Sequence, residues 1–199
     1  MGGAGSGKDT MAEAICSMVP DCHQLAFADA VKSACADMIN ELLNKYDISH
    51  PVQESVLAET PETKKLLRPL WQWVGTDLMR DTIDRNFWIK QLETRMNGIM
   101  DLNRKIDFLY FVNRTEPSFV ISDCRFANER EWAIKNGFKV VHIFGRKPLS
   151  SSNSEHRSET EHIGLKSDLS YNNSGSIDQM VGWIVDNILP LGVDQSGTQ

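Results

Sequence analysis

The sequence has no apolar run long enough to cross a membrane, and its first residues, MGGAGSGKDT, lack the pattern of a secretory signal peptide. It also lacks repeats and long low-complexity tracts. Its 21 Lys and Arg are outnumbered by 27 Asp and Glu, a balance that argues against duplex nucleic acid as a partner. The sequence therefore predicts a protein that binds neither membranes nor nucleic acid.

Metal-binding and disulfide patterns are missing too. The four cysteines, at positions 16, 22, 35 and 124, form no CxxC pair and follow no common spacing, and the five histidines form no HExxH set. These absences argue against a zinc site built by the protein. They favour reduced thiols, as in a cytoplasmic protein, over a disulfide framework.

What the chain does contain is a regular alternation of helix and strand patterns. Its 199 residues are 41% hydrophobic, enough for one domain with a buried core. The expected helices lie at 9–18, 29–43, 64–91 with a break near 84, 129–136 and 177–189. The expected strands lie at 24–28, 119–121 and 139–144, with an ambiguous apolar run at 108–112. Three polar segments are also expected. Residues 44–64 should form an excursion between helices, residues 148–158 a mobile loop, and residues 192–199 a frayed tail. This alternation predicts an α/β fold with a mainly parallel sheet flanked by helices.

The strongest motif is the segment GGAGSGKDT at residues 2–10, which fits the pattern GxxxxGK and runs directly into the first expected helix. Glycines let backbone N–H groups turn toward phosphate oxygens, the helix N-terminus adds positive potential, and Lys8 is placed to reach the β and γ phosphates. The alternative is a flexible glycine-rich N-terminus. The predicted phosphate-binding residues are Gly3, Ala4, Gly5, Ser6, Gly7, Lys8, Asp9 and Thr10.

Two features depart from the usual P-loop. Asp9 stands where most P-loops have Ser or Thr, and the hydroxyl follows one place later at Thr10. In addition, only Met1 precedes the glycines, whereas a P-loop normally follows a buried strand, so the first strand is missing. We therefore expect Met1 to be an internal methionine or a misplaced start, with an apolar strand upstream of it.

A second motif is FVISDCRF at 119–126. An acid at the carboxyl end of a buried strand beside a P-loop is well placed to hold Mg²⁺, so Asp123, together with Thr10, is the predicted metal neighbourhood. Arg125, two residues further on, is placed to reach a phosphate. The alternative for Asp123 is a helix-capping or turn residue, and Glu129 is expected in the first turn of the next helix.

Together these motifs resemble the phage-type deoxynucleoside monophosphate kinases, a branch of the P-loop nucleotide kinases. The matching segments are GSGKDT at 5–10, LAFADAVK at 25–32, LWQWVGTDLMRDTIDRNFWIKQL at 70–92, VISDCRFANERE at 120–131, HRSETE at 156–161 and NNSGSIDQM at 172–180. The resemblance implies a single P-loop kinase domain over 1–199, with a helical acceptor-binding region at about 29–92 and a mobile lid at about 146–162. It also implies ATP-dependent phosphorylation of a deoxynucleoside 5′-monophosphate with Mg²⁺, commonly by a homodimer, in the host cytoplasm if the chain is phage-encoded.

The resemblance also assigns roles to individual residues. It gives Lys8 and Thr10 to the ATP phosphates and the turn at 172–176 to the neighbourhood of the adenine. On the acceptor side it places Asp29, Lys32, Gln72, Gly75, Thr76 and Arg80, and Trp88 is a further candidate there. Either Arg80 or Arg125 is suited to grip the acceptor phosphate in a bidentate fork, and both count with Lys8 and Asp123 as catalytic candidates. The lid contributes Arg146 and Arg157 to the nucleotide.

Each of these assignments has an ordinary alternative. Arg80 on an amphipathic helix is also typical of a solvated charge, and the predicted lid has the composition of a surface loop. Trp71 is expected in the core, whereas Trp73 or Trp88 is a candidate for stacking on a base. For the whole chain, the alternatives are an animal-type phosphomevalonate kinase, which shares the GKD loop and the SDxR strand end, and a catalytically defective nucleotide-binding protein.

Overall fold

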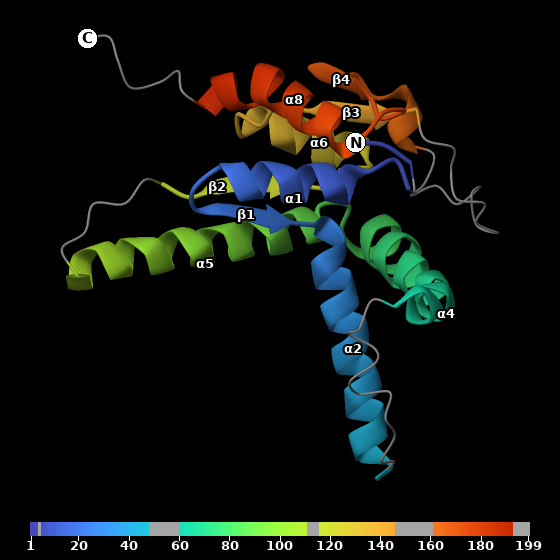
Figure 1. Cartoon of the computed structure of the whole chain (residues 1–199). Helices are drawn as coiled ribbons and strands as arrows, with labels where there is room; N and C mark the ends of the chain where they lie inside the picture. The colour runs from blue at the N-terminus through green and yellow to red at the C-terminus, as the bar shows by residue number, and fades with distance from the viewer. Residues whose placement is uncertain (4, 48–59, 111–115, 146–160, 193–199) are drawn as a thin grey trace. The chain divides into compact units, whose positions relative to one another are not determined.

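The computed structural model (Figure 1) describes residues 1–3, 5–47, 60–110, 116–145 and 161–192. The chain divides into two compact units. Unit 1 comprises Met1–Leu25 and Asn97–Gln199, and unit 2 comprises Ala26–Met96. Unit 1 contains helices and parallel strands, whereas the described part of unit 2 consists of helices. The expected α/β class with parallel strands is thus confirmed.

Unit 1 is built around two pairs of short parallel strands. β1 (Cys22–Leu25) pairs with β2 (Ser118–Ile121), and β3 (Val141–Phe144) pairs with β4 (Leu169–Asn172). The helices of this unit are α1 (Lys8–Met18), α6 (Ala127–Lys135), α8 (Ile177–Asn187), the later part of α5 (Phe87–Tyr110), and 3-10 turns at Glu161–Gly164 and Leu189–Gly192. Parallel strands end at the same edge, so the residues that follow β1 and β2 leave the sheet on one side.

The core of unit 1 lies between α1, α8 and the strands. α1 packs against β1, β2 and α8 (Figure 1). The buried core cluster consists of Met11, Ile15, Ile143, Tyr171, Met180 and Ile184. Within it, Met11 and Ile15 are four residues apart on α1, as are Met180 and Ile184 on α8, so each pair shares one helix face. This packing fixes α1, and with it the glycine loop at its N-terminus.

Met1 lies alongside β3. Its amine donates a hydrogen bond to Val141 O at 2.5 Å, and Ile143 N donates to Met1 O at 2.8 Å. The side chain of Met1 is buried. These are the contacts that a strand neighbour makes, and the strand expected upstream of Met1 stays a prediction.

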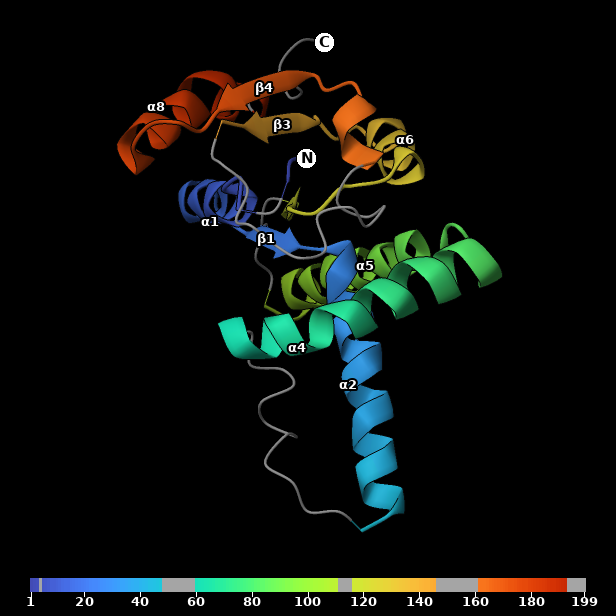
Figure 2. The ribbon, with the colours of Figure 1, turned by 90° about the vertical axis from the view of Figure 1, so that its right-hand side faces the viewer.

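Unit 2 is formed by α2 (Phe27–Lys45), α4 (Pro61–Gln72), the π-helix η1 (Trp73–Ile83) and the first part of α5. α2 packs against α4, which crosses it in Figure 2, and against η1. Thr60 caps α4 by accepting a hydrogen bond from Thr63 N at 3.2 Å. The π-helical winding ends where Asp84 N donates to Met79 O, five residues back, at 2.8 Å. π-helical turns are rare in proteins, but those that occur are often found at functional sites.

Several expected elements differ at their ends. The strand expected at 24–28 ends at Leu25, because Asp29 accepts a hydrogen bond from Ala26 N at 3.2 Å and α2 begins at Phe27. The break expected near 84 is confirmed, but α5 continues to Tyr110, so the described part of the ambiguous apolar run is helical. β4 was not expected at all. Gly137 follows α6 with φ 79°, which confirms it as the helix end.

Some predictions fall outside the described residues. They concern Ala4, most of the polar excursion, the end of the apolar run, the C-terminal tail and the lid residues Arg146 and Arg157. In the part of the chain that the structure describes, no helix is both long enough and apolar enough to span a membrane.

Candidate functional site

The glycine loop of unit 1 is braced from behind by Asn173. Gly7 has φ 95° and directly precedes α1, and a Cβ atom on it would lie 2.2 Å from Asn173 Nδ2. That amide is 1% exposed and donates a hydrogen bond to Ser6 O at 2.8 Å. Position 7 therefore accepts only glycine without rearrangement. Asn173 comes from the turn that the resemblance placed near the adenine, and here it holds the loop.

The loop and the start of α1 have the chemistry of a phosphate cradle. Among the described residues no side chain caps the N-terminus of α1, whereas Ser176 caps α8 by accepting a hydrogen bond from Gln179 N at 3.3 Å. Lys8 Nζ donates to Gly3 O at 2.7 Å and so reaches across the loop. The Ser6 hydroxyl is buried and makes no hydrogen bond to any described group. Helix amides, an ammonium and a buried hydroxyl are the groups that a nucleotide's phosphates require.

Asp123 lies two residues beyond the end of β2 in unit 1. Ser122 N donates to Leu25 O at 3.1 Å, which extends the pairing of β2 with β1 to the residue before Asp123, and Asp123 itself is only 9% exposed. Burial lowers the pKa of the Met1 amine to about 6, and the charges that also act on this amine include Lys8 and Asp123. Lys8 and Asp123 are thus both close enough to the Met1 amine for their charges to act on it, and their roles at a P-loop and at its acidic strand end stay predictions.

The residues fit a magnesium ion carried by a nucleotide. A single carboxylate at Asp123 and a hydroxyl at Thr10 suit Mg²⁺, which keeps several waters and bridges substrate phosphates. Among the residues described, no group of three or more His, Cys, Asp or Glu side chains could hold a metal ion.

Glu129 fixes the backbone that carries Arg125. One carboxylate oxygen, Oε2, accepts hydrogen bonds from Arg125 N at 2.7 Å and Phe126 N at 3.0 Å. Glu129 is 5% exposed, and this burial, with the nearby Asp123 charge, raises its pKa to about 8. Its place in the first turn of α6 confirms the expectation. Glu161 Oε1 adds a hydrogen bond from Ala127 N at 3.3 Å, which ties the end of the predicted lid segment to α6.

In unit 2, the predicted acceptor residues of η1 are buried. Gly75, Thr76 and Arg80 all lie on this π-helix, and Arg80 is 3% exposed with Nη1 2.7 Å from Asp81 Oδ1. The alternative that Arg80 is a solvated surface charge is therefore wrong. Trp88 is 7% exposed and its Nε1 donates to Gly75 O at 2.7 Å, so its indole N–H is used to hold η1. Contact of Trp88 with a base stays a prediction.

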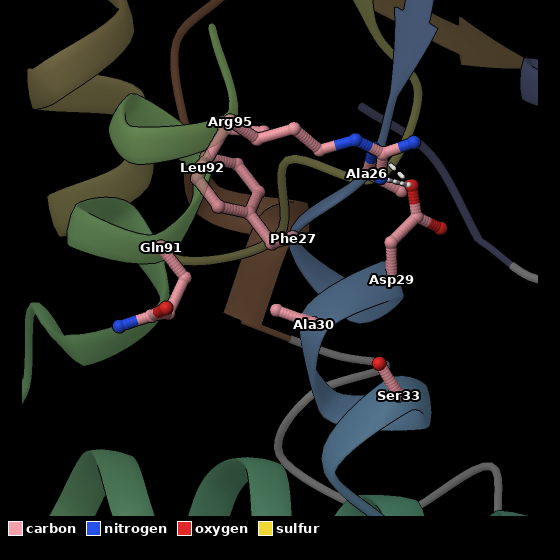
Figure 3. Close-up of a pocket in the computed structure, with 8 residues that line it drawn as sticks. All are labelled: Ala26, Phe27, Asp29, Ala30, Ser33, Gln91, Leu92 and Arg95. Carbon is pink, nitrogen blue, oxygen red and sulfur yellow. Dashed lines mark hydrogen bonds and ion pairs between the residues drawn. The ribbon is translucent and has the colours of Figure 1, made fainter. Parts of the chain in front are cut away.

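A pocket of about 270 Å³ lies between α2 and α5 within unit 2. It is lined by Ala26, Phe27, Asp29, Ala30, Ser33, Gln91, Leu92 and Arg95. Figure 3 shows Arg95 reaching from α5 to Asp29 on α2, where Nη1 and Oδ2 are 2.8 Å apart. The same Oδ2 accepts the hydrogen bond from Ala26 N, so the start of α2 holds Asp29 in place.

Only Asp29 of the predicted acceptor residues lines this pocket. Lys32 lies instead over the Trp71 ring, with Nζ 5.6 Å from the ring centroid. Sequence reasoning missed Arg95 and assigned no role to Gln91, although Gln91 lies within the matching segment 70–92. They are four residues apart on α5 and so share a face, but such spacing is equally typical of a solvated helix.

The chain is similar to known proteins of one family. The profile of one family, described as "Deoxynucleotide monophosphate kinase", matches residues 43–184. A "Putative deoxynucleotide monophosphate kinase" of Acanthamoeba polyphaga mimivirus is 30% identical over 197 residues, which cover 93% of this chain and 92% of that protein. A "Deoxynucleotide monophosphate kinase" of Enterobacteria phage T4 is 26% identical over 125 residues, which cover 63% of this chain and 46% of that protein.

Proposed function

Since this chain belongs to the deoxynucleotide monophosphate kinase family, we propose that it transfers the γ-phosphoryl group of ATP to the 5′-phosphate of a deoxynucleoside monophosphate. The products are the deoxynucleoside diphosphate and ADP. The observation that carries the proposal is the glycine loop braced by Asn173, with Lys8 reaching across it and with the charges of Lys8 and Asp123 both acting on the Met1 amine. This is the arrangement that donor phosphates need in a phosphotransferase.

At the donor site, the amides of the loop and of the α1 N-terminus bind phosphate oxygens, and Lys8 leaves Gly3 O to bind the β and γ phosphates. Thr10 and Asp123 would hold the magnesium ion of the nucleotide, which would neutralise charge on those phosphates. Arg125, whose backbone Glu129 holds, adds a guanidinium for the transferring group. Ala4, Arg146 and Arg157 stay predicted contacts of the nucleotide.

At the acceptor site, unit 2 supplies the pocket and the cations. We assign the acceptor to the pocket that Asp29 and Arg95 share, with Phe27 and Leu92 as its apolar wall. Arg95, which lines the pocket, has a guanidinium suited to bidentate contact with a monophosphate, and Arg80, which does not line it, stays a predicted contact of the acceptor phosphate. The acceptor phosphate is already anionic, so the transfer needs no general base, and the protein's task is to position the two substrates and neutralise their charge.

The test is a coupled assay of ADP release with ATP, Mg²⁺ and one acceptor at a time. The acceptors are the four common deoxynucleoside monophosphates and mevalonate 5-phosphate, with a reaction lacking acceptor as the blank. We expect release that depends on at least one deoxynucleoside monophosphate. Release with mevalonate 5-phosphate alone, or the same rate with no acceptor, would overturn the proposal.

A matched pair of variants links the activity to the glycine loop. Lys8→Ala removes the phosphate contact and should lower turnover by roughly 10²–10³-fold. Lys105→Ala, on an exposed lysine of α5, should leave turnover unchanged. Near-normal turnover of the Lys8 variant would contradict the assignment of the donor site.

A further inference from the structure

Two cysteines lie against each other where α1 ends and β1 begins. The Sγ atoms of Cys16, on the last turns of α1, and Cys22, the first residue of β1, are 2.6 Å apart. Both are free thiols and both are partly exposed. The sequence spacing favoured unconnected reduced thiols, and the chain reversal between α1 and β1 is what brings these two together.

This reversal is held by bonds that do not involve the cysteines. Val19 N donates to Ile15 O at 3.0 Å and closes the end of α1, and Ser118 N donates to Asp21 O at 3.0 Å. Asn103 Nδ2 also donates to Asp21 Oδ2, at 2.5 Å. Since sulfur atoms in a disulfide are about 2.05 Å apart, the bond requires only a small approach of the two side chains.

We propose that Cys16 and Cys22 form a reversible disulfide that joins the end of α1 to the start of β1. The oxidant is a low-molecular-weight disulfide such as oxidised glutathione. The Cys16 thiolate attacks one glutathione sulfur and releases the first glutathione thiolate. Cys22 then loses its proton to solvent and attacks Cys16 Sγ, which releases the second glutathione. The two cysteine thiols give up two electrons and two protons, and the glutathione disulfide takes up both.

The environment of the four thiols favours this pair. Cys35 and Cys124 are 1% and 8% exposed, so glutathione has little access to them. Burial also raises the pKa of Cys124 to about 12. Burial and the neighbouring Cys16 side chain raise the pKa of Cys22 to about 12 as well. The second step should therefore be the slow one and should accelerate as pH rises.

The disulfide would restrain the C-terminal end of α1, the helix whose N-terminal end carries Lys8. It requires neither ATP nor an acceptor, so it does not depend on the proposed function. Its test is likewise independent of any kinase assay.

The experiment oxidises the whole folded chain with oxidised glutathione at about pH 8, then unfolds it, alkylates the remaining thiols and digests it with trypsin. Cleavage at Lys and Arg places Cys16 and Cys22 together on peptide 9–32, Cys35 on peptide 33–45 and Cys124 on peptide 115–125. We expect peptide 9–32 to carry no alkyl group and to be about 2 Da lighter than its dithiol form. The other two peptides should be alkylated, and dithiothreitol should restore both thiols of peptide 9–32.

Two variants identify the partners. In Cys22→Ser, oxidation should stop at a mixed disulfide of glutathione with Cys16, and in Cys16→Ser peptide 9–32 should no longer form an internal link. Cys35 and Cys124 in the unmodified chain serve as internal controls for a preserved fold, because they stay unreactive before unfolding. Three results would each overturn the proposal. The first is alkylation of both cysteines of peptide 9–32 after oxidation, and the second is glutathione retained on Cys16 in the unmodified chain. The third is a link to Cys35 or Cys124.

Discussion

Replacing Gly7 by alanine is the sharpest perturbation of the glycine loop. A non-glycine residue at φ 95° costs roughly 1–2 kcal/mol in the backbone alone. The new Cβ would lie 2.2 Å from Asn173 Nδ2, so the buried amide must move and lose its hydrogen bond to Ser6 O. Leaving such a buried group unpaired costs a further ~1–3 kcal/mol. Gly7→Ala should therefore lower the free energy of unfolding by about 2–5 kcal/mol.

The assay measures thermal unfolding with and without ATP, and circular dichroism monitors the transition. For a chain of this length that loss corresponds to a melting temperature lower by roughly 5–20 °C. Because the displaced Asn173 no longer holds the loop, ATP should also give the variant little of the stabilisation that it gives the unmodified chain.

The matched control is Gly182→Ala on α8. A Cβ at Gly182 meets no atom within 4 Å, so alanine should stabilise the helix by roughly 0.5–1 kcal/mol. If Gly7→Ala melts at the same temperature as the unmodified chain and binds ATP equally well, Asn173 does not brace the loop and the reasoning is refuted.

Three other perturbations test the rest of the site. Arg80→Lys keeps the charge but loses the fork, so it should raise the KM of the acceptor more than that of ATP, and an unchanged acceptor KM would remove Arg80 from the site. Arg95→Gln should raise the acceptor KM several-fold, whereas Arg104→Gln, on an exposed arginine of the same helix, should not; equal effects would contradict the pocket assignment. In the folded chain the pKa of Glu129 is about 8, whereas its ordinary value is 4.5, so the folded state loses free energy of unfolding as pH rises from 4.5 to 8. Without metal or nucleotide, Glu129→Gln should therefore melt above the unmodified chain at pH 9 and near it at pH 4, and parallel melting curves would refute this.

The sequence was sufficient for the features that depend on local patterns. The glycine loop and α1 follow from nine consecutive residues, and the position of Asp123 follows from the apolar strand before it. Asp84 ends η1 as expected, and Glu129 lies in the first turn of α6. Each of these depends on neighbours within a few residues, which periodicity and capping rules describe well.

The features that were missed depend on long-range contacts. Asn173 reaches a loop 167 positions away, and Arg95 meets Asp29 across 66 positions. β4 has only four residues and becomes a strand by pairing with β3. The π-helical winding of η1 begins four residues after Pro69. Proline lacks the backbone N–H that a regular helix uses, but a proline alone predicts a kink and not π-helical winding.

The most direct test of the account follows the phosphoryl group itself. ATP labelled in its γ-phosphate is incubated with the chain, Mg²⁺ and each deoxynucleoside monophosphate, and the products are separated. The account predicts label in the β-phosphate of a deoxynucleoside diphosphate, at a rate that Lys8→Ala lowers by roughly 10²–10³-fold. Label found only in inorganic phosphate, or retained in ATP with every acceptor, would contradict it.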